Sequence, residues 1–260
     1  MTILDELAAH ARERVRQAKA KTPLEEIRRQ ALTAANPVPS FADALRKPGL
    51  SFICECKKAS PSKGLIAPDF PYLAIARDYE AAGADAISVL TEPKWFLGSD
   101  DYLREIAAAV SLPCLRKDFI VDDYMICEAR LLGAAAVLLI VALLDEGRLR
   151  EYLALARALG LGVLTEVHDE REIETALAAG AEIIGINNRN LNDFSVDTGN
   201  ARRLRQRIPA GTLVVAESGI QSPADTARLR ENGVDAVLVG EALMRADDKR
   251  QKLAELRGAP

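Results

Sequence analysis

One local pattern recurs along most of this chain, and it limits the folds that the chain can adopt. A helix-like segment ends at a glycine, and an apolar run rich in Val, Ile and Leu begins within a few residues. The five clearest copies are AAGADAISVL (81–90), LLGAAAVLLI (131–140), ALGLGVLTEV (158–167), AAGAEIIGIN (178–187) and ENGVDAVLVG (231–240). Glycine at that place suits the left-handed cap of a helix, and continuous apolar runs are typical of strands buried on both faces. The pattern therefore predicts repeated helix–strand units around a parallel sheet.

Three further apolar runs complete the set of predicted strands, namely Ser51–Lys57, Pro113–Lys117 and Thr212–Glu217. A helical pattern follows each of the eight strands, at residues 71–82, 101–110, 123–132, 146–159, 170–179, 198–207, 223–231 and 241–256. Eight such units predict a (β/α)8 barrel, the TIM barrel, with an open doubly wound sheet as the alternative.

A helical extension, residues 1–47, precedes the first strand. An apolar stripe runs along it at Ile3, Leu7, Ala11 and Val15. No flexible linker interrupts the chain, and 260 residues suit one α/β barrel. We therefore predict one domain over residues 1–260.

Polar residues end five of the predicted strands, in step with apolar residues on the same face. They are Glu55 and Lys57, Lys117, Glu166, Asn187 and Glu217. A charge at one strand end can simply mark where the chain emerges into water. Strand ends of a parallel barrel share one mouth, however, and buried charges need partners. The five strands together predict a mixed Glu/Lys site that binds an anionic substrate and exchanges protons.

Two glycines near helix starts predict where a phosphate binds. Gly219 follows the seventh strand and precedes a helix opened by Ser222, and Gly240 runs directly into the last helix at Glu241. Backbone N–H groups at such positions bind phosphate in many barrels. The turn at residues 60–64, Ser-Pro-Ser-Lys-Gly, is not a Walker loop and could equally be a surface turn. Helix capping alone is the alternative explanation for the residues at the helix starts.

Charge and hydropathy exclude several classes of function. The net charge is −4 and no basic block appears, so we expect no nucleic-acid partner. The first residues, MTILDELAAHARERV, carry charges throughout and do not form a signal peptide. The longest apolar run, Ala134–Leu144, is shorter than the roughly 20 residues that span a bilayer. We predict a cytoplasmic protein with no membrane partner.

The possible metal ligands do not form a set. The four cysteines are Cys54, Cys56, Cys114 and Cys127, and no histidine or cysteine near the first two completes a tetrahedral site. We therefore expect reduced core cysteines, no metal and no cofactor. His10 lies on a charged amphipathic stretch and is interpreted as solvated. His168 follows a strand end, where it either lines the site or caps a loop.

The sequence resembles the indole-3-glycerol phosphate synthase family of tryptophan biosynthesis. The matching stretches are CECKKASPSKG, SVLTEPKWFLGS, LPCLRKDFI, LLIVALL, LTEVHDE, GINNRNL, VAESGI and LVGEALM, in family order from residue 51 onward. The resemblance implies a monofunctional barrel enzyme that needs no cofactor. Its substrate would be 1-(2-carboxyphenylamino)-1-deoxyribulose 5-phosphate, whose aromatic ring attacks the ribulose carbonyl before carbon dioxide and water leave.

The resemblance also implies roles for individual residues. Lys117 would be the general acid, Glu166 its carboxylate counterpart, and Lys57 a second substrate lysine oriented by Glu55. The division of work between the two lysines stays open. Further polar site residues would be Asn187, Glu217, Ser218 and, toward the substrate carboxylate, Arg189. The phosphate contacts would be Ser60, Gly219, Gly240 and the backbone of Glu241, and the anthranilate pocket would comprise Pro61, Phe96, Phe119, Leu138 and Leu191. We expect a monomer that acts on a small phosphorylated molecule.

Two alternatives remain from the residues alone. One is another phosphate-binding barrel, an isomerase or an aldolase. An isomerase would not need the aromatic pair Phe96 and Phe119, whereas Lys117 alone does not exclude a Schiff-base aldolase. The other is a non-catalytic ligand-binding barrel, which we would expect to lack one of the charged strand-end residues, and none is missing.

Overall fold

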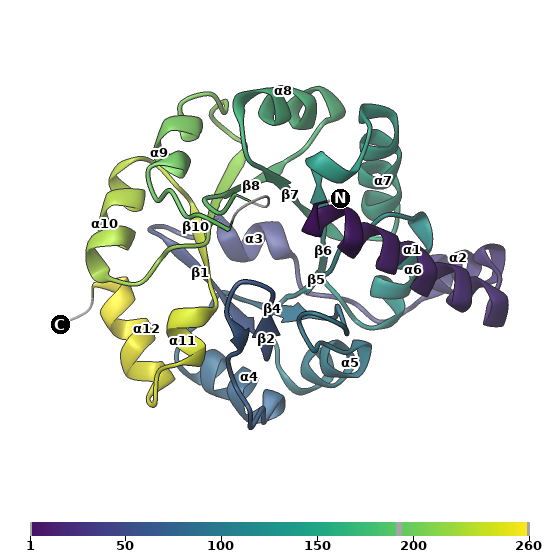
Figure 1. Cartoon of the computed structure of the whole chain (residues 1–260), viewed down its shortest axis with the longest axis horizontal. Helices are drawn as coiled ribbons and strands as arrows, with labels where there is room; N and C mark the ends of the chain where they lie inside the picture. The colour runs from purple at the N-terminus through teal and green to yellow at the C-terminus, as the bar shows by residue number, and fades with distance from the viewer. Residues whose placement is uncertain (1, 191–193, 259–260) are drawn as a thin grey trace.

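Eight parallel strands close into a barrel at the centre of the molecule (Figure 1). The computed structural model describes residues 2–190 and 194–258. The barrel strands are β1 (Ser51–Cys56), β4 (Ala86–Leu90), β5 (Cys114–Lys117), β6 (Ala136–Ile140), β7 (Gly162–Val167), β8 (Ile183–Asn187), β9 (Leu213–Glu217) and β10 (Ala236–Val239). Pairing of Ile53 in β1 with Leu238 in β10 and with Ala86 in β4 closes the ring. The predicted (β/α)8 barrel is confirmed, and the open sheet is wrong.

Helices surround the barrel and cover the outer faces of its strands (Figure 1). They are α4 (Tyr72–Ala81), α5 (Asp100–Ala109), α6 (Asp123–Leu131), α7 (Glu146–Ala158), α8 (Glu170–Ala179), α9 (Asn200–Arg205), α10 (Pro223–Glu231), α11 (Glu241–Met244) and α12 (Lys249–Arg257), with a 3₁₀ turn at Val141–Leu143. Every residue of β1, β4, β6, β8, β9 and β10 is buried, which explains their nearly continuous apolar sequences.

The last predicted helix, residues 241–256, is wrong as a single element. The structure divides it into α11 and α12, separated by a short connection. Asp248 starts the second helix, because its side chain accepts a hydrogen bond from the backbone N–H of Gln251. An aspartate in this position favours a new helix start over continuation of the preceding helix.

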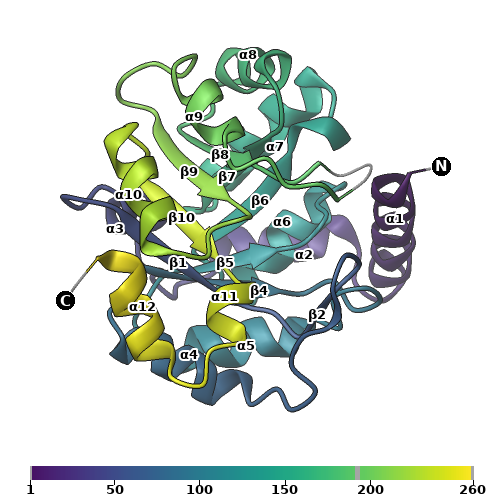
Figure 2. The ribbon, with the colours of Figure 1, turned by 60° about the vertical axis from the view of Figure 1, so that its left-hand side comes forward.

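The N-terminal extension forms three helices, α1 (Ile3–Lys21), α2 (Leu24–Thr33) and α3 (Phe41–Leu45). They lie at both ends of the barrel: α1 is in front of the strands in Figure 1 and α3 behind them, and Figure 2 shows α1 outside one end. Phe41 of α3 packs so closely on Gly162, at the start of β7, that a Cβ atom there would lie 3.1 Å from the Phe41 Cβ. The extension is thus part of the barrel's packing.

Ion pairs and apolar contacts hold α1 against the mouth of the barrel. Arg14 and Lys19 each lie 2.8 Å from a carboxylate, those of Asp118 and Asp122. The prediction that His10 is solvated is wrong. Its Nδ1 lies 3.1 Å from Glu92, and its ring packs edge-on against Trp95.

A small hairpin follows β1 and stands beside the mouth. Its strands are β2 (Ala59–Ser60) and β3 (Gly64–Leu65), so the predicted turn forms the hairpin tip. Lys63, at the tip, lies 3.4 Å from Glu241 at the start of α11. In the described part of the chain, no helix combines the length and the apolar character needed to cross a membrane.

Candidate active site

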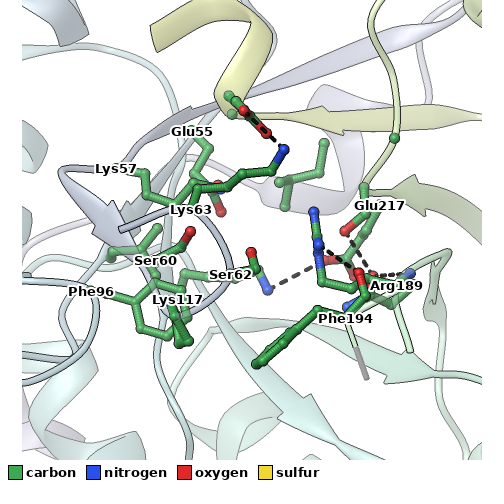
Figure 3. A pocket seen from close by; sticks show the side chains of 18 of the residues that line it. Glu55, Lys57, Ser60, Ser62, Lys63, Phe96, Lys117, Arg189, Phe194 and Glu217 are labelled. Atoms are coloured by element: carbon green, nitrogen blue, oxygen red, sulfur yellow. Dashed lines mark hydrogen bonds and ion pairs between the residues drawn. The ribbon is translucent and has the colours of Figure 1, made fainter. Parts of the chain in front are cut away.

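A cavity of about 530 Å³ opens at the C-terminal ends of the barrel strands (Figure 3). The structure brings sixteen of the predicted site residues to its wall: Glu55, Lys57, Ser60, Pro61, Phe96, Lys117, Phe119, Leu138, Glu166, Asn187, Arg189, Glu217, Ser218, Gly219, Gly240 and Glu241. The other one, Leu191, lies outside the described residues. The cavity therefore has the composition that strand phase and the family resemblance predict.

Lys117 lies between two carboxylates near the centre of the cavity. Its Nζ is 3.3 Å from Oε2 of Glu166 on β7 and 3.3 Å from Oε2 of Glu217 on β9. Burial alone would lower the pKa of Lys117, but Glu217, Glu166 and Glu55 together raise it above its usual value. The side chain is therefore a stable ammonium that still reaches the open cavity, with 15% of its surface exposed.

The two carboxylates around Lys117 have opposite pKa shifts. Burial raises the pKa of Glu217 to about 7, and the negative charge of Glu166 adds to this against the opposing effect of Lys117. Burial also disfavours the Glu166 carboxylate, but Lys117, His168 and Asn187 outweigh it and lower the pKa of Glu166 well below its usual range. Neighbouring carboxyl groups with separated pKa values can act as acid and base in one reaction.

A second lysine–carboxylate pair lies at the end of β1. Lys57 Nζ is 2.5 Å from Glu55 Oε2, and both side chains are largely buried. Gly240 leaves the space that this pair occupies: a Cβ atom there would lie 2.9 Å from Lys57 Nζ and would collide with the Glu55 carboxylate. The lysine–carboxylate pair thus requires the glycine at the start of α11.

The amide of Asn187 is fixed by the residues around it. Its Oδ1 accepts hydrogen bonds from Ser218 Oγ at 2.8 Å and from the backbone N–H of Arg189 at 3.0 Å. Because the oxygen is used in this way, the NH₂ group is left to donate, and it helps lower the pKa of Glu166. The guanidinium of Arg189 donates to the backbone oxygen of Phe194 at 2.9 Å, so the loop after β8 holds it at the cavity wall.

The loop after β9 turns sharply beneath the cavity. Ser218 and Gly219 both have left-handed backbone conformations, with φ of 67° and 79°. A Cβ atom on Gly219 would lie 2.7 Å from Val196 and 2.9 Å from Thr198, so only glycine fits without moving the loop after β8. The turn leads to α10, whose first turn is held by a capping box between Ser222 and Asp225. The cavity is lined by residues of this loop and by the residues before α11, namely Ser218, Gly219, Ile220, Gln221, Val239 and Gly240.

Aromatic side chains also line the cavity. Phe96 and Phe119 pack with ring centroids 5.9 Å apart. The backbone N–H of Phe96 also donates to the buried carboxylate of Glu92, which fixes the loop that carries this ring. Figure 3 shows Phe194 pointing into the cavity, and sequence reasoning missed this residue. It lies in an irregular loop where no periodic pattern predicts its direction.

Other lining residues were also missed. Ile3, Leu4 and Leu7 of α1 reach the cavity, as does Lys63 of the hairpin tip. The apolar stripe on α1 was visible in the sequence, but it does not say which surface it covers. Lys63 stands within the predicted turn and had no role assigned.

The four cysteines are free and buried, and burial raises the pKa of Cys114 to about 12. Across residues 2–190 and 194–258, no group of three or more His, Cys, Asp and Glu side chains is arranged to hold a metal ion.

Comparisons with known proteins place the chain among its relatives. The family model described as Indole-3-glycerol phosphate synthase matches residues 4–256. The protein of that name from Ruminiclostridium cellulolyticum is 52% identical over 258 residues, covering 99% of this chain and 99% of the relative. The one from Endomicrobium trichonymphae is 52% identical over 256 residues, covering 98% and 99%.

Solved structures show the same barrel at much lower identity. The 3-hexulose-6-phosphate synthase from Salmonella typhimurium has a TM-score of 0.66 and 14% identity, covering 80% of this chain and 97% of that one. A mandelate oxidase variant has a TM-score of 0.62 and 22% identity, covering 80% and 72%. Likeness at this level concerns the fold alone.

Proposed function

The chain belongs to the indole-3-glycerol phosphate synthase family, and we propose that the cavity at the barrel mouth performs the reaction of that family with Lys117 as its central acid. The enzyme is a carbon–carbon lyase of tryptophan biosynthesis that converts 1-(2-carboxyphenylamino)-1-deoxyribulose 5-phosphate into indole-3-glycerol phosphate. The observation that carries the assignment of roles is the position of the Lys117 ammonium, 3.3 Å from each of two carboxylates with opposite pKa shifts.

In ring closure, the aromatic carbon that bears the carboxylate attacks the ribulose carbonyl. The electron pair of the carbonyl moves to oxygen, and the Lys117 ammonium donates the proton that this oxygen needs. Breaking the bond to the carboxylate then releases carbon dioxide and restores the aromatic ring. The charged cavity favours ring closure because the Lys117 ammonium is already in position when negative charge develops on the carbonyl oxygen.

Dehydration requires an acid for the leaving hydroxyl and a base for the departing proton. Lys57 and Glu217 are the candidate acids: the first is held by Glu55, and the second has a pKa of about 7. Glu166, ionised at neutral pH, is the proposed base. The aromatic wall of Phe96 and Phe119 would hold the anthranilate ring, and Arg189 would bind its carboxylate.

The phosphate would bind between the loops that follow β9 and β10. Backbone N–H groups at Gly219, Gly240 and Glu241 can donate to it, and the hydroxyl of Ser60, which also lines the cavity, is a further candidate donor. Lys63 adds a positive charge at this rim, where it pairs with the Glu241 side chain.

The experiment that tests this function is direct. Purified protein, dialysed against chelator, is incubated with the anilino-deoxyribulose phosphate, and indole fluorescence is recorded. We expect steady formation of the indole product without added metal. A preparation that is folded but forms none would contradict the proposed function, and activity that appears only with a divalent metal would contradict the cofactor-free mechanism.

A Schiff-base aldolase is disfavoured by the charge on Lys117. Imine formation needs a neutral amine, and the surrounding carboxylates raise the pKa of Lys117 rather than lower it. Borohydride added with a ketose phosphate should therefore leave the mass of the protein unchanged.

We further propose that the enzyme acts as a monomer in the cytoplasm. One chain supplies both lysine–carboxylate pairs of the cavity. Four free thiols agree with a reducing compartment. Sedimentation analysis of the active protein tests the first of these two statements.

A further inference from the structure

His168 lies between the carboxylates of Glu166 and Glu172, and of these two only Glu166 lines the cavity. Its Nε2 is 3.4 Å from Oε1 of Glu166, the oxygen that does not face Lys117. Its Nδ1 is 3.1 Å from Oε2 of Glu172 on α8. The chain Glu172–His168–Glu166 therefore leads from the outer helices to the proposed base.

Hydrogen bonds to the backbone N–H and to the carbonyl oxygen of His168 fix the position of this residue. The N–H of His168 donates to Glu172 Oε2 at 2.7 Å, and its carbonyl oxygen accepts from Asn200 Nδ2 at 3.2 Å. Glu172 is itself held in the first turn of α8, where its N–H donates to the capping residue Asp169. Only 18% of the His168 side chain is exposed, so the ring has little freedom to turn.

Both ring nitrogens face carboxylate oxygens, and this determines the charge of the ring. A neutral imidazole would direct a lone pair at one carboxylate, whereas an imidazolium presents a positively charged N–H group to each. The contact of Nε2 with Glu166 at 3.4 Å is an ion pair and not an aligned hydrogen bond. Burial alone would lower the pKa of His168, but Glu166 and Glu172 outweigh it and raise the pKa to about 10.

We propose that His168 is a positioning residue for the reaction: its imidazolium, held by Glu172, orients Glu166 with Oε2 toward Lys117 and keeps that carboxylate ionised. This inference rests on the proposed function for its catalytic part. The geometric part, a permanent imidazolium against Glu166, can be tested without any substrate.

The other charged or polar groups that face Glu166 are Lys117 from β5, Asn187 from β8 and Glu217 from β9. Glu55 of β1 acts on Lys117 in turn. Lys117 is the proposed acid and gives up its proton during turnover, so its charge is lost when the base must act. His168 then stays in contact with Glu166 as a cation.

The first test is a titration by NMR of protein labelled in its histidine rings. The chain has two histidines, so His10→Gln leaves one signal to follow. We expect His168 to stay doubly protonated up to at least pH 8 in the otherwise unchanged protein. Glu172→Gln should lower its midpoint, because one of the two carboxylates is gone, whereas Glu174→Gln on the same helix should not. A ring that titrates below pH 7 in the parent protein would overturn the inference.

The second test is kinetic and uses the same pair of variants. Glu172→Gln should lower kcat by about tenfold, since a misplaced catalytic group commonly costs this much or more, with KM changed by less than about twofold. Glu172→Gln should leave the acidic limb of the kcat–pH profile nearly in place, because the His168 ring is protonated at acidic pH with or without Glu172. His168→Gln should move this limb to higher pH, because Glu166 loses the cation that stabilises its charged form, and His168→Lys should restore part of the shift. Glu174→Gln should match the parent protein.

A merely structural histidine would give a different result. Its variants would melt at lower temperature but keep the parent pH profile when folded, which would contradict the inference. If the parent protein forms no indole product, the proposed function fails, while the NMR titration still decides whether an imidazolium is held against Glu166.

Discussion

Two neighbouring residues of β5, Arg116 and Lys117, are both buried cations, yet their surroundings differ in nearly every respect. Successive side chains of a strand point to opposite faces, so Arg116 points outward to the helices and Lys117 into the barrel. Each is paired with carboxylates. The comparison distinguishes a charged cluster that holds a fold together from one that is prepared for a reaction.

Arg116 has short contacts in every direction. Its partners are Asp100 at 2.8 Å, Glu128 at 2.7 Å, the Met125 carbonyl oxygen at 2.9 Å and Thr91 Oγ1 at 3.2 Å. Only 1% of its side chain is exposed. All of these bonds join β5 to the loop after β4 and to helices α5 and α6. A ligand therefore cannot reach this side chain.

Lys117 has longer contacts and an open side. Both carboxylates are at 3.3 Å, and Glu217 Oε1 has no hydrogen-bond partner among the residues that the structure describes. A buried polar atom left unpaired in a cavity is a common mark of a binding or catalytic site. We call Lys117, Glu166 and Glu217 the mouth cluster, and Arg116, Asp100 and Glu128 the outer cluster. The mouth cluster thus leaves a hydrogen-bonding atom without a partner, and a substrate can supply the missing contact.

The largest effect is expected for Lys117→Ala. An ammonium can protonate the carbonyl oxygen as charge develops, whereas a methyl group cannot. General acid catalysis contributes a factor of about 10² to 10⁴, so kcat should fall by at least about 10²-fold, with a smaller change in substrate Kd. Steady-state and binding measurements on one preparation check this.

Lys117→Arg is the control for charge at this position. A guanidinium keeps the positive charge but holds its proton too tightly to donate it, and its planar shape differs. We expect little recovery of kcat. Full recovery would mean that charge alone, without proton donation, accounts for the role of Lys117.

The next effect is on stability. Arg116→Met should lower the free energy of unfolding by about 3 kcal/mol, because it leaves several carboxylates without their partner. This loss of stability lies at the lower end of the range for breaking a buried ion pair. The reason is that the Asp100 side chain is 40% exposed and can be rehydrated. Urea unfolding curves check this, and a loss below about 1 kcal/mol would mean that the outer cluster contributes little.

Gly240→Ala should disturb the second lysine pair. The added Cβ would collide with the Glu55 carboxylate and lie 2.9 Å from Lys57 Nζ, so the pair must move. A displaced catalytic group can cost about tenfold or more in kcat, and we expect a rise in KM as the phosphate loop shifts with it. Gly211→Ala is the control for activity: no heavy atom lies within 4 Å of the added Cβ, and the strain at its left-handed backbone (φ 96°) arises in a turn that does not line the cavity, so it should lower stability and leave kcat and KM unchanged. Equal kinetics in both variants would contradict the role of Gly240.

The smallest effect is on the pH dependence of stability. The pKa of Glu217 is about 7 in the folded protein and near 4.5 when unperturbed, so between these values the folded state binds a proton that the unfolded state does not. Stability due to this group is therefore present below pH 4.5 and is lost as the pH rises toward 7. Glu217→Gln should remove this decline, as melting temperatures across the range would show. An unchanged decline would mean that another group titrates there.

Much of the mouth cluster was predictable from sequence because it follows from alternation. Lys117, Glu166 and Glu217 each lie two residues from a core residue on the same strand, and parallel strands end at one edge. The outer cluster was not predicted. Arginine is seldom fully buried, and the partners of Arg116 come from helices and loops whose facing sides the sequence does not define.

Loops and helix docking explain the other failures. The stripe on α1 predicts an apolar face, but its position over the mouth depends on pairs such as Arg14 with Asp118, which are 104 residues apart. The break between α11 and α12 was missed because most of the residues around it favour a helix. Phe194 has a left-handed backbone (φ 60°), which no sequence pattern around it indicates.

The most direct test of the contrast between the two clusters is the kcat of Arg116→Met and Lys117→Met, measured at a temperature at which both variants are folded. The same substitution is made in two adjacent residues, so chain position and side-chain volume are matched. We predict that folded Arg116→Met turns over within about threefold of the parent protein, while Lys117→Met is slower by at least about 10²-fold. Comparable losses of kcat in both variants, or a larger loss for Arg116→Met, would contradict the assignment of the mouth cluster to catalysis and of the outer cluster to stability.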